Sequence, residues 1–399
     1  MKLIYITNTR LPSEKANSYQ SMQMCSSFSK YFDEVELWTG RGRNTKEMSE
    51  IKDVFEHYNI GESFLIRKFF QFDSRILVNL SEFLWANLKG FVFSVNVCLH
   101  LIKYRKSQEV FIYTRIWHVL YVLRFFKKIG LVDNKIYYES HKFSKFLLGV
   151  LKRVDGLVVV NNQLSAIYKE KGIGNVLAAH DGVKMSTFLI DDNSSFNTPE
   201  LDKFSNKVVF SYIGRFVTMG EEKGIEDIIK SIQYIDNQDI YFAFIGGPMD
   251  CVPQYLKLSE SLNIEKERLI FIDRQPISDL KFYMQKSKAL LMPFPYTDHY
   301  AYYMSPLKMF EYMTSGVPII ASSLPSIREV LIDMDNAILC EPDNPLDLAN
   351  KVQYVLDNDC SLIAKKALVD VQEYTWEKRA QNIKGFIQST HNEQNVCVE

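Results

Sequence analysis

Two groups of charged side chains follow short apolar runs in the second half of this chain of 399 residues. Arg215 ends the run YIGR, and Lys223 stands near the start of the next helical pattern. In SPLKMFEYM, Lys308 and Glu311 are three residues apart, behind Ser305. Guanidinium and ammonium groups bind phosphate oxygens, and a carboxylate accepts hydrogen bonds from vicinal hydroxyls such as those of a ribose. These residues predict a site for a phosphorylated, hydroxyl-bearing ligand, although solvated loop cations are the alternative.

The segment from Ser305 to Gly316 predicts a helix that its own sequence delimits. Ser305 is a good N-cap, Pro306 suits the first helical position, and Gly316 can adopt the left-handed conformation that ends a helix. Free backbone N–H groups near Leu307 and Lys308 would then form an anion site. An ordinary surface pair of the lysine and the glutamate is the other interpretation.

In the first half of the chain, His141 has an informative context. It follows KIYYES, a predicted buried strand, and so would lie at the carboxyl end of the strand, where open α/β sheets bind ligands. A histidine that only caps or packs is the alternative. The seven histidines and six cysteines show no metal-ligand spacing, and Asp333 and Asp335 suit a turn better than a metal site. We expect no bound metal.

Short apolar runs alternate with helical patterns along the whole chain, which is typical of buried parallel strands in α/β folds. The runs are KLIYIT, EVELWT, EVFIYTR, KIYYES and GLVVVN, then VVFSYIGR, YFAFIGG, RLIFID, ALLMPF, PIIAS and AILCEP. The polar stretch DDNSSFNTPELDKFSN separates the two sets. We predict two doubly wound Rossmann-like domains, 1–190 and 207–372, with a linker at 191–206 and a C-terminal helix and tail at 373–399 that could pack back on the first domain.

The charge is unevenly distributed between the two halves. Residues 1–185 contain 27 Lys plus Arg against 17 Asp plus Glu, whereas the remainder contains 20 against 31. A basic half favours an anionic partner such as a membrane surface, and chance drift of solvated charge is the alternative. The start of the chain suits a strand better than a leader, the cysteines form no CxxC, and the apolar segment 83–102 contains Asn, Lys and His. We therefore expect a cytoplasmic protein without a membrane-spanning helix.

The segment HKFSKFLLGVLKR has an amphipathic pattern with cations around its apolar stripe. The stripe comprises Phe143, Phe146, Leu147, Val150 and Leu151. It would face either an anionic membrane surface or the core of the domain.

Taken together, these stretches resemble the retaining nucleotide-sugar glycosyltransferases of family 4, which have the GT-B fold with two Rossmann-like domains facing a cleft. The similar stretches in the second half are YIGRF with a later KGIEDIIKSI, FIGGP, SPLKMFEYMTSGVPIIAS, LPSIREVL and AILCEP. In the first half they are TRLPSEKANSYQ, FIYTR, YYESH and AAHDGV. The resemblance spans nearly the whole chain in the same order.

The resemblance implies roles for individual residues. Arg215 and Lys223 would act on the donor diphosphate, and His141 would face the sugar. The other implied donor-binding residues are Ser305, Leu307, Lys308, Glu311, Tyr303 and Arg274, and those of the acceptor or phosphate loop are Glu14, Lys15 and Asn17. Two features depart from the family pattern: Tyr303 stands where many relatives have a glutamate, and the insertion VTMGEE precedes Lys223.

The resemblance also implies a reaction. We expect a retaining, metal-independent hexosyl- or N-acetylhexosaminyltransferase without a cofactor. It would move sugar from a nucleotide-diphosphate sugar to a glycan or lipid-linked acceptor in capsule, O-antigen or lipopolysaccharide biosynthesis. The implied partners are the nucleotide sugar and the acceptor. The basic first half and the stripe of residues 143–151 add an anionic membrane surface, and we expect no nucleic acid. A nucleotide-sugar epimerase of the same architecture and a non-catalytic nucleotide-sugar-binding protein are the alternatives.

Overall fold

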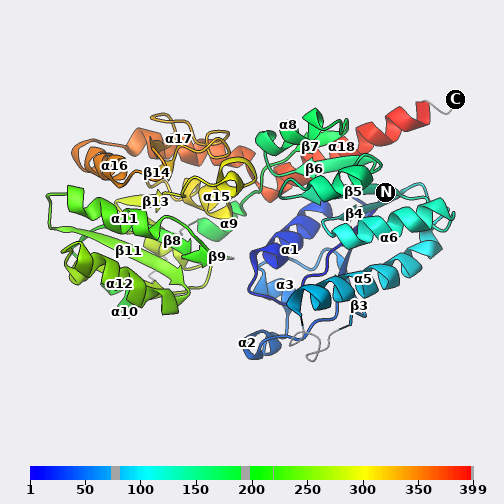
Figure 1. The fold of residues 1–399 in the computed structure, drawn as a ribbon, viewed down its shortest axis with the longest axis horizontal. Coiled ribbons are helices and arrows are strands. Elements are labelled where there is room, and N and C mark those ends of the chain that lie inside the picture. The colour runs from blue at the N-terminus through cyan, green and yellow to red at the C-terminus, as the bar shows by residue number, and fades with distance from the viewer. Residues whose placement is uncertain (73–80, 190–197, 219, 397–399) are drawn as a thin grey trace. The chain divides into compact units, whose positions relative to one another are not determined.

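A computed structural model describes residues 1–72, 81–189, 198–218 and 220–396, which form two compact α/β units (Figure 1). Unit 1 comprises Met1–Val160, Leu164–Ala179 and the chain from Trp376 onward, and unit 2 comprises Asn161–Gln163 and His180–Thr375. The division at Ala179 precedes the predicted boundary at 190. The helix α10 (Pro199–Asp202), inside the predicted linker, belongs to unit 2, and residues 190–197 of that linker lie outside the described residues.

Unit 1 is built on a parallel sheet with the strand order β3-β2-β1-β4-β5-β6-β7. Its strands are β1 (Lys2–Ile6), β2 (Glu34–Gly40), β3 (Leu65–Phe69), β4 (Val110–Thr114), β5 (Lys135–Ser140), β6 (Gly156–Val159) and β7 (Val176–Ala178). The five runs predicted in this half are all strands. The sequence missed β3 and β7, because an edge strand exposes side chains and lacks a continuous apolar run.

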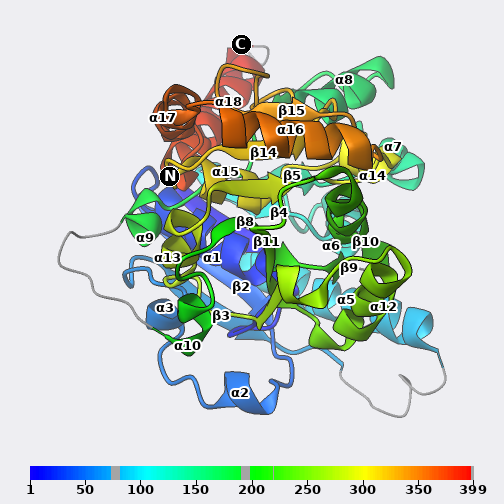
Figure 2. The ribbon, with the colours of Figure 1, turned by 90° about the vertical axis from the view of Figure 1, so that its left-hand side faces the viewer.

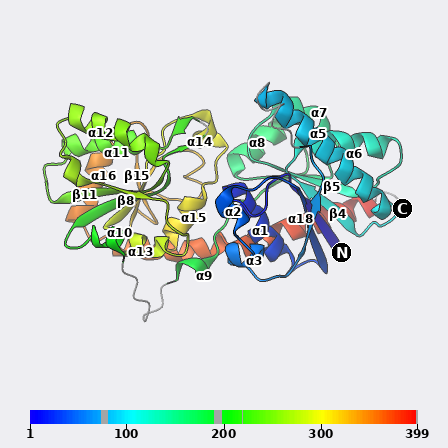
Figure 3. The same ribbon diagram turned by 90° about the horizontal axis from the view of Figure 1, so that it is seen from below.

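Helices cover both faces of this sheet, with α5 and α6 on one face and α1 and α18 on the other (Figure 3). The helices of unit 1 are α1 (Ala16–Phe28), α2 (Lys46–Ser49), α3 (Val54–His57), α5 (Glu82–Leu101), α6 (Trp117–Lys128), α7 (Leu148–Leu151), α8 (Asn162–Glu170) and α18 (Trp376–Val396). The last helix, α18, packs along α1, so the end of the chain returns to the first unit.

By length and composition alone, the segment Phe83–Tyr104, which contains most of α5, could cross a membrane. In the structure, α5 packs against α6 and β3. Its side chains Phe93, Val97 and Cys98 are fully buried there.

Unit 2 is built on a second parallel sheet, with the order β12-β11-β8-β13-β14-β15. Its strands are β8 (Val208–Arg215), β11 (Ile240–Gly247), β12 (Leu269–Asp273), β13 (Ala289–Met292), β14 (Ile319–Ser322) and β15 (Ile338–Cys340). All six were predicted. The insertion before Lys223 forms a separate hairpin of β9 (Val217–Thr218) and β10 (Glu221–Glu222).

Two apolar cores lie on opposite faces of the second sheet. One core includes side chains of α11 (Ile225–Ser231), α12 (Val252–Ser261) and α16 (Pro345–Asp357), which runs beside β14 and β15 (Figure 2). The other includes side chains of α13 (Leu280–Gln285), α15 (Leu307–Met313) and α17 (Ser361–Asp370). The remaining helices are α9 (Met185–Phe188) and α14 (Asp298–Tyr302). Both units are therefore doubly wound, and parallel strands present their carboxyl ends at one edge of each sheet.

Candidate functional site

The carboxyl end of β8 is shaped by glycines. Gly214 has a φ of +139°, and a Cβ there would lie 2.8 Å from Nζ of Lys308. A Cβ on Gly246 of the neighbouring strand would lie 2.0 Å from the carbonyl oxygen of Gly214. Gly246 requires glycine because the backbone of Gly214 approaches it too closely for any side chain, and Gly214 favours glycine because of its positive φ. The strand end and Lys308 are thus brought into direct proximity.

The helix α15 carries Lys308 to this strand end, but its start differs from the prediction. It begins at Leu307 with Pro306 at the N-cap position, and no side chain caps it. Oγ of Ser305 instead accepts a hydrogen bond from the backbone N–H of Asp181, at 3.0 Å. Proline before Leu307 places the serine one residue too early to reach the first turn. Ser305 is therefore not the N-cap, whereas Gly316 has the expected left-handed φ of +65°.

A tyrosine fixes α15 against β8. The hydroxyl of Tyr312 accepts a hydrogen bond from the backbone N–H of Ile213 at 2.7 Å and donates to the carbonyl oxygen of the same residue at 3.1 Å. Tyr312 is fully buried. Since Tyr312 stands four residues after Lys308 on the helix, this contact sets the position of the lysine along the strand end.

Lys308 is the most unusual residue of the site, because only 9% of it is exposed. Its Nζ lies 3.6 Å from the ring centroid of Tyr212 and 5.5 Å from that of Phe294. Within the described part of the chain, no hydrogen-bond acceptor reaches this atom. Burial and, secondly, the charge of Lys223 hold the pKa of Lys308 well below its ordinary value. A buried cation without an acceptor is a strong candidate for an anion-binding group.

Glu311 follows Lys308 by one helical turn and is partly buried. Burial raises the pKa of its carboxyl group to about 7, although the positive charge of Lys308 opposes the shift. The ionised carboxylate offers two acceptor oxygens, as hydroxyl recognition requires.

Arg215 and Lys223 meet at the base of the inserted hairpin. Arg215 is exposed at the tip of β8, and the backbone N–H of Lys223 donates to the carbonyl oxygen of Phe216 at 3.1 Å. Burial and, secondly, the charge of Arg215 lower the pKa of Lys223 to about 8. Because the charge of Lys223 also acts on Lys308, the structure brings three of the predicted cations together.

Sequence reasoning missed Glu222, which holds this loop in place. Its carboxylate accepts hydrogen bonds from the backbone N–H groups of Gly224 at 2.6 Å, Ile225 at 2.5 Å and Glu226 at 3.3 Å. These are the free donors at the start of α11. Burial raises the pKa of Glu222, while the three hydrogen bonds act in the opposite direction. The signal in the sequence was an acidic residue two positions before a glycine that opens a helix.

The other predicted donor residues lie around this edge of unit 2. Tyr303 ends α14 and donates its backbone N–H to the carbonyl oxygen of His299 at 3.0 Å, and Leu307 is the first residue of α15. Arg274 follows the end of β12, and its backbone N–H donates to Oδ1 of Asp273 at 2.6 Å. In the described part of the chain, no hydrogen bond or ion pair joins the side chains of these three residues to Lys308, so their roles stay predictions.

In unit 1, His141 lies directly after β5 and is oriented by a buried glutamate. Nε2 of His141 is 2.5 Å from Oε1 of Glu139, which is 1% exposed. Arg379 of α18 lies 3.4 Å from the same oxygen, and Tyr113 and Gln20 donate to the carboxylate. Although burial opposes ionisation, Arg379 and then His141 hold the pKa of Glu139 well below its ordinary value.

Glu139 and Arg379 were not predicted. The sequence signal was a charged residue inside the apolar run YYES, which demands a buried partner. That partner comes from a helix some 240 residues away. Only the folded chain identifies it.

The predicted loop of unit 1 connects β1 to α1. Glu14 forms an ion pair with Arg10 at 2.5 Å, and Lys15 is exposed. Oδ1 of Asn17 is buried and, within the described residues, has no hydrogen-bond donor. The loop therefore contains a carboxylate paired with Arg10, and the unsatisfied acceptor of Asn17 follows it in the first turn of α1.

No three His, Cys, Asp or Glu side chains gather into a metal-binding group in the described ranges. Asp333 accepts from the backbone N–H of Leu339 at 2.8 Å, and Asp335 faces Lys366 at 3.8 Å, so this pair forms a turn as predicted. Metal independence stays a prediction.

Comparison with known proteins adds to this geometry. Residues 207–358 match the family model of glycosyl transferases group 1. Over 222 residues the chain is 24% identical to the probable glycosyltransferase WbjE of Pseudomonas aeruginosa, a match that covers 53% of this chain and 52% of that protein. The match thus spans about half the length of this curated relative.

Solved structures resemble the whole chain. The crystal structure of Anabaena Alr3699/HepE in complex with UDP and glucose has a TM-score of 0.68 at 15% identity, covering 98% of this chain and 100% of that chain. The apo form of the lipopolysaccharide outer core galactosyltransferase WaaB has a TM-score of 0.69 at 16% identity, covering 98% and 99%. The chain has the GT-B fold, as predicted, and the match to the glycosyl transferases group 1 model lies within unit 2.

Proposed function

We propose that this protein is a retaining glycosyltransferase of family 4 that uses a nucleotide-diphosphate sugar. The observation that carries the proposal is the buried Nζ of Lys308, which has no acceptor in the described residues and lies at the carboxyl end of β8. A diphosphate would supply the missing acceptor oxygens. The match of unit 2 to glycosyl transferases group 1 supports this assignment.

In the proposed reaction, a hydroxyl oxygen of the acceptor bonds to the anomeric carbon as the bond from that carbon to the diphosphate oxygen breaks. Negative charge grows on the leaving diphosphate, which takes up the proton of the hydroxyl group. Arg215, Lys223 and Lys308 would stabilise that charge without a metal, and stabilisation of developing charge is usually the largest catalytic term. Glu311 would accept hydrogen bonds from the ribose hydroxyls. His141, oriented by Glu139, would bind the sugar, and the loop containing Glu14, Lys15 and Asn17 would approach the acceptor.

We propose a hexose or N-acetylhexosamine as the sugar, and a glycan or lipid-linked acceptor in cell-surface polysaccharide biosynthesis. Two relatives support this class, since one is named as a probable glycosyltransferase and one as a lipopolysaccharide galactosyltransferase. Anabaena HepE was crystallised with UDP-glucose, so UDP-glucose is the first donor to test.

The test is incubation of the protein with nucleotide sugars, followed by measurement of released nucleoside diphosphate and of the sugar product. Slow release of diphosphate with retained anomeric configuration would support transfer. A changed sugar on intact nucleotide would instead support an epimerase, and binding without turnover a non-catalytic protein.

The variant Lys308→Ala should lose nucleotide affinity, and Lys257→Ala, at an exposed lysine of α12 in the same unit, is its matched control. If the wild type and Lys308→Ala bind the nucleotide with equal affinity, the proposed donor site is refuted.

A further inference from the structure

The helix α6 of unit 1 has an outward face of aromatic and cationic residues. This face comprises Trp117, Tyr121, Arg124, Phe125 and Lys128, at the spacing of one side of a helix. Phe125 is 58% exposed, whereas the opposite side of the helix is buried in the core. A solvated helix face ordinarily carries charged and polar residues, so the aromatic side chains on this face need an explanation.

A neighbouring segment extends the same face. Phe146 is 67% exposed, and its ring lies 5.6 Å from that of Trp117 and 5.4 Å from that of Tyr121. The hydroxyl of Tyr121 also donates to the carbonyl oxygen of Phe146 at 3.1 Å.

The structure divides the stripe predicted for this segment between its two alternatives, because most of the stripe faces the core and Phe146 does not. Leu147, Val150 and Leu151 are buried in unit 1, and Phe143 packs on Tyr168. Phe146 thus remains outside as part of an aromatic cluster on α6, because the segment forms a 3-10 turn and a short helix rather than one long amphipathic helix.

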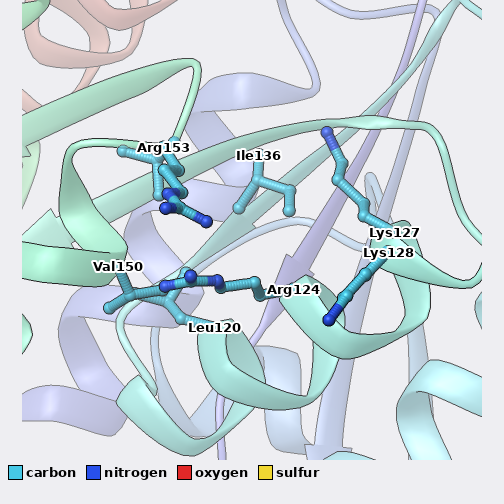
Figure 4. Close-up of a pocket in the computed structure, with 8 residues that line it drawn as sticks. Leu120, Arg124, Lys127, Lys128, Ile136, Val150 and Arg153 are labelled. Carbon is cyan, nitrogen blue, oxygen red and sulfur yellow. The ribbon is translucent and has the colours of Figure 1, made fainter.

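A basic pocket of about 450 Å³ continues this surface along α6 and α7. Its apolar lining is Leu120, Ile136, Val150 and Val154, and its cationic lining is Arg124, Lys127, Lys128 and Arg153. Figure 4 shows the guanidinium groups of the two arginines on one side of the pocket and the two lysines on the other. Lys127 lies 3.7 Å from Asp155, whereas in the described ranges no carboxylate pairs with the other three cations.

This pocket is separate from the candidate catalytic residues. Ile136 is the second residue of β5, so the pocket lies at the amino edge of the sheet. His141 follows the last residue of the same strand, at the opposite edge. A ligand bound in this pocket would therefore be distinct from the donor and its leaving group.

The two chain segments that form this surface are strongly basic. Residues 115–132 and 142–154 together contain eight Lys or Arg and no Asp or Glu. Basic residues near an anionic bilayer are attracted to its surface, and Trp, Tyr and Phe settle at the level of the lipid headgroups. The positive charge and the aromatic side chains of this surface therefore both suit an anionic bilayer.

We infer that the α6 face, defined as Trp117, Tyr121, Phe125, Phe146 and the basic pocket, docks on a bilayer that contains anionic phospholipid. The aromatic side chains enter the headgroup region, and Arg124 and Arg153 in the pocket bind a lipid phosphate. This docking would hold unit 1 at a membrane and does not depend on the proposed transferase reaction.

Flotation with lipid vesicles tests the inference on the full chain. We expect binding to vesicles of phosphatidylcholine with phosphatidylglycerol, weaker binding in high salt, and no binding to phosphatidylcholine alone. The double variant Arg124→Glu with Arg153→Glu should bind anionic vesicles more than about tenfold less tightly. Its control, Lys257→Glu with Lys266→Glu on unit 2, makes the same change in net charge and should bind as the wild type does.

Insertion of the aromatic residues has its own readout. Brominated acyl chains should quench the fluorescence of the wild type more than that of Trp117→Phe, since Trp38 and Trp376 are buried and the partly buried Trp85 is present in both proteins. Phe125→Ser with Phe146→Ser should weaken vesicle binding, whereas Leu362→Ser, at a side chain that is 76% exposed on unit 2, should not.

Failure to float with anionic vesicles, or equal binding by the double arginine variant and its control, would overturn the inference. Saturable binding of inorganic phosphate by the pocket without vesicle binding would also overturn it, in favour of a soluble ligand. Thermal unfolding checks that each variant is folded. Nucleotide affinity should be the same in the double arginine variant as in the wild type. If the wild type binds anionic vesicles but turns over none of the donors, the proposed function is refuted and the docking surface is not.

Discussion

Lys308 combines three properties that ordinary folding disfavours in one side chain. It is buried, it has no acceptor among the described residues, and a second cation, Lys223, acts on it. A surrounding aromatic ring, that of Tyr212, offsets part of the desolvation cost through a cation–π contact. The free protein therefore retains an arrangement that is more favourable once an anion is bound.

Removing the charge at this position should stabilise the free protein. We expect Lys308→Met to raise the free energy of unfolding by on the order of 1 kcal/mol, because the apolar stem is kept and the unpaired ammonium is lost. The unfolded state binds more protons at this lysine, so the stability of the wild type should rise with pH toward the ordinary pKa of 10.5. The difference in Tm between the two proteins should thus shrink as pH rises.

Thermal unfolding across this pH range measures that difference, with Lys257→Met as the control at an exposed position. A lower Tm for Lys308→Met at neutral pH would contradict the expectation.

Nucleotide affinity should depend on pH in a bell-shaped manner. Below about pH 7 Glu311 becomes protonated and loses its acceptor capacity, and above about pH 8 Lys223 loses its charge. Titration calorimetry with a nucleoside diphosphate should therefore show the tightest binding between these two values. Glu311→Gln should flatten the acidic side and Lys223→Met the basic side; a flat profile for the wild type would remove both assignments.

At the scale of elements, the site depends on how α15 is attached to β8. The hydroxyl of Tyr312 bonds both backbone groups of Ile213, and Gly214 leaves room for the lysine. The end of β8 and the helix α15 are therefore held firmly together. Glu222 stabilises the adjoining start of α11 in the same way.

Tyr312→Phe should lower stability by about 1–3 kcal/mol, because it leaves the buried backbone groups of Ile213 without their partner. It should also weaken nucleotide binding, since the hydrogen bonds that fix α15, and with it Lys308, against the end of β8 would be lost. Tyr255→Phe is a matched control: Tyr255 is 1% exposed, and its hydroxyl has no partner in the described residues. Denaturant unfolding and calorimetry should separate the two variants, and similar losses in both would argue against a positioning role for Tyr312.

Strands were predicted correctly where both of their faces are buried, because such strands appear in the sequence as continuous apolar runs. Every run buried on both faces, such as KIYYES and VVFSYIGR, became a strand of a parallel sheet. The edge strand β3 was missed because its exposed positions can be polar, and its pattern therefore has no continuous apolar run. Ser305 was misassigned as an N-cap because local propensity could not reveal its contact with Asp181.

At the scale of the whole molecule, the chain ends in the unit where it began. The helix α18 belongs to unit 1, and Arg379 on it reaches the buried carboxylate of Glu139 beneath His141. The C-terminal helix is therefore part of the support of a candidate catalytic residue.

Arg379→Met should destabilise the protein by about 3–5 kcal/mol, because Glu139 would keep a buried charge without its guanidinium partner. The low pKa of Glu139 contributes stability that is present above its ordinary value of 4.5 and is lost as pH falls below it. The variant should therefore lose less additional stability on acidification than the wild type. Denaturant unfolding at several pH values measures both effects, and Lys378→Met, an exposed neighbour on α18, should behave as the wild type.

The sequence by itself determined the class of fold and the cations at the carboxyl end of β8, because apolar runs and residue types are local properties. It also indicated His141 from its place after a strand. Only the tertiary structure decided that Lys308 is buried without an acceptor, that Glu139 and Arg379 support His141, and that Phe146 joins α6 while its neighbours enter the core. The physical reason is that burial and electrostatic coupling arise between segments distant in sequence, and these interactions set the pKa values and the free surfaces on which function depends.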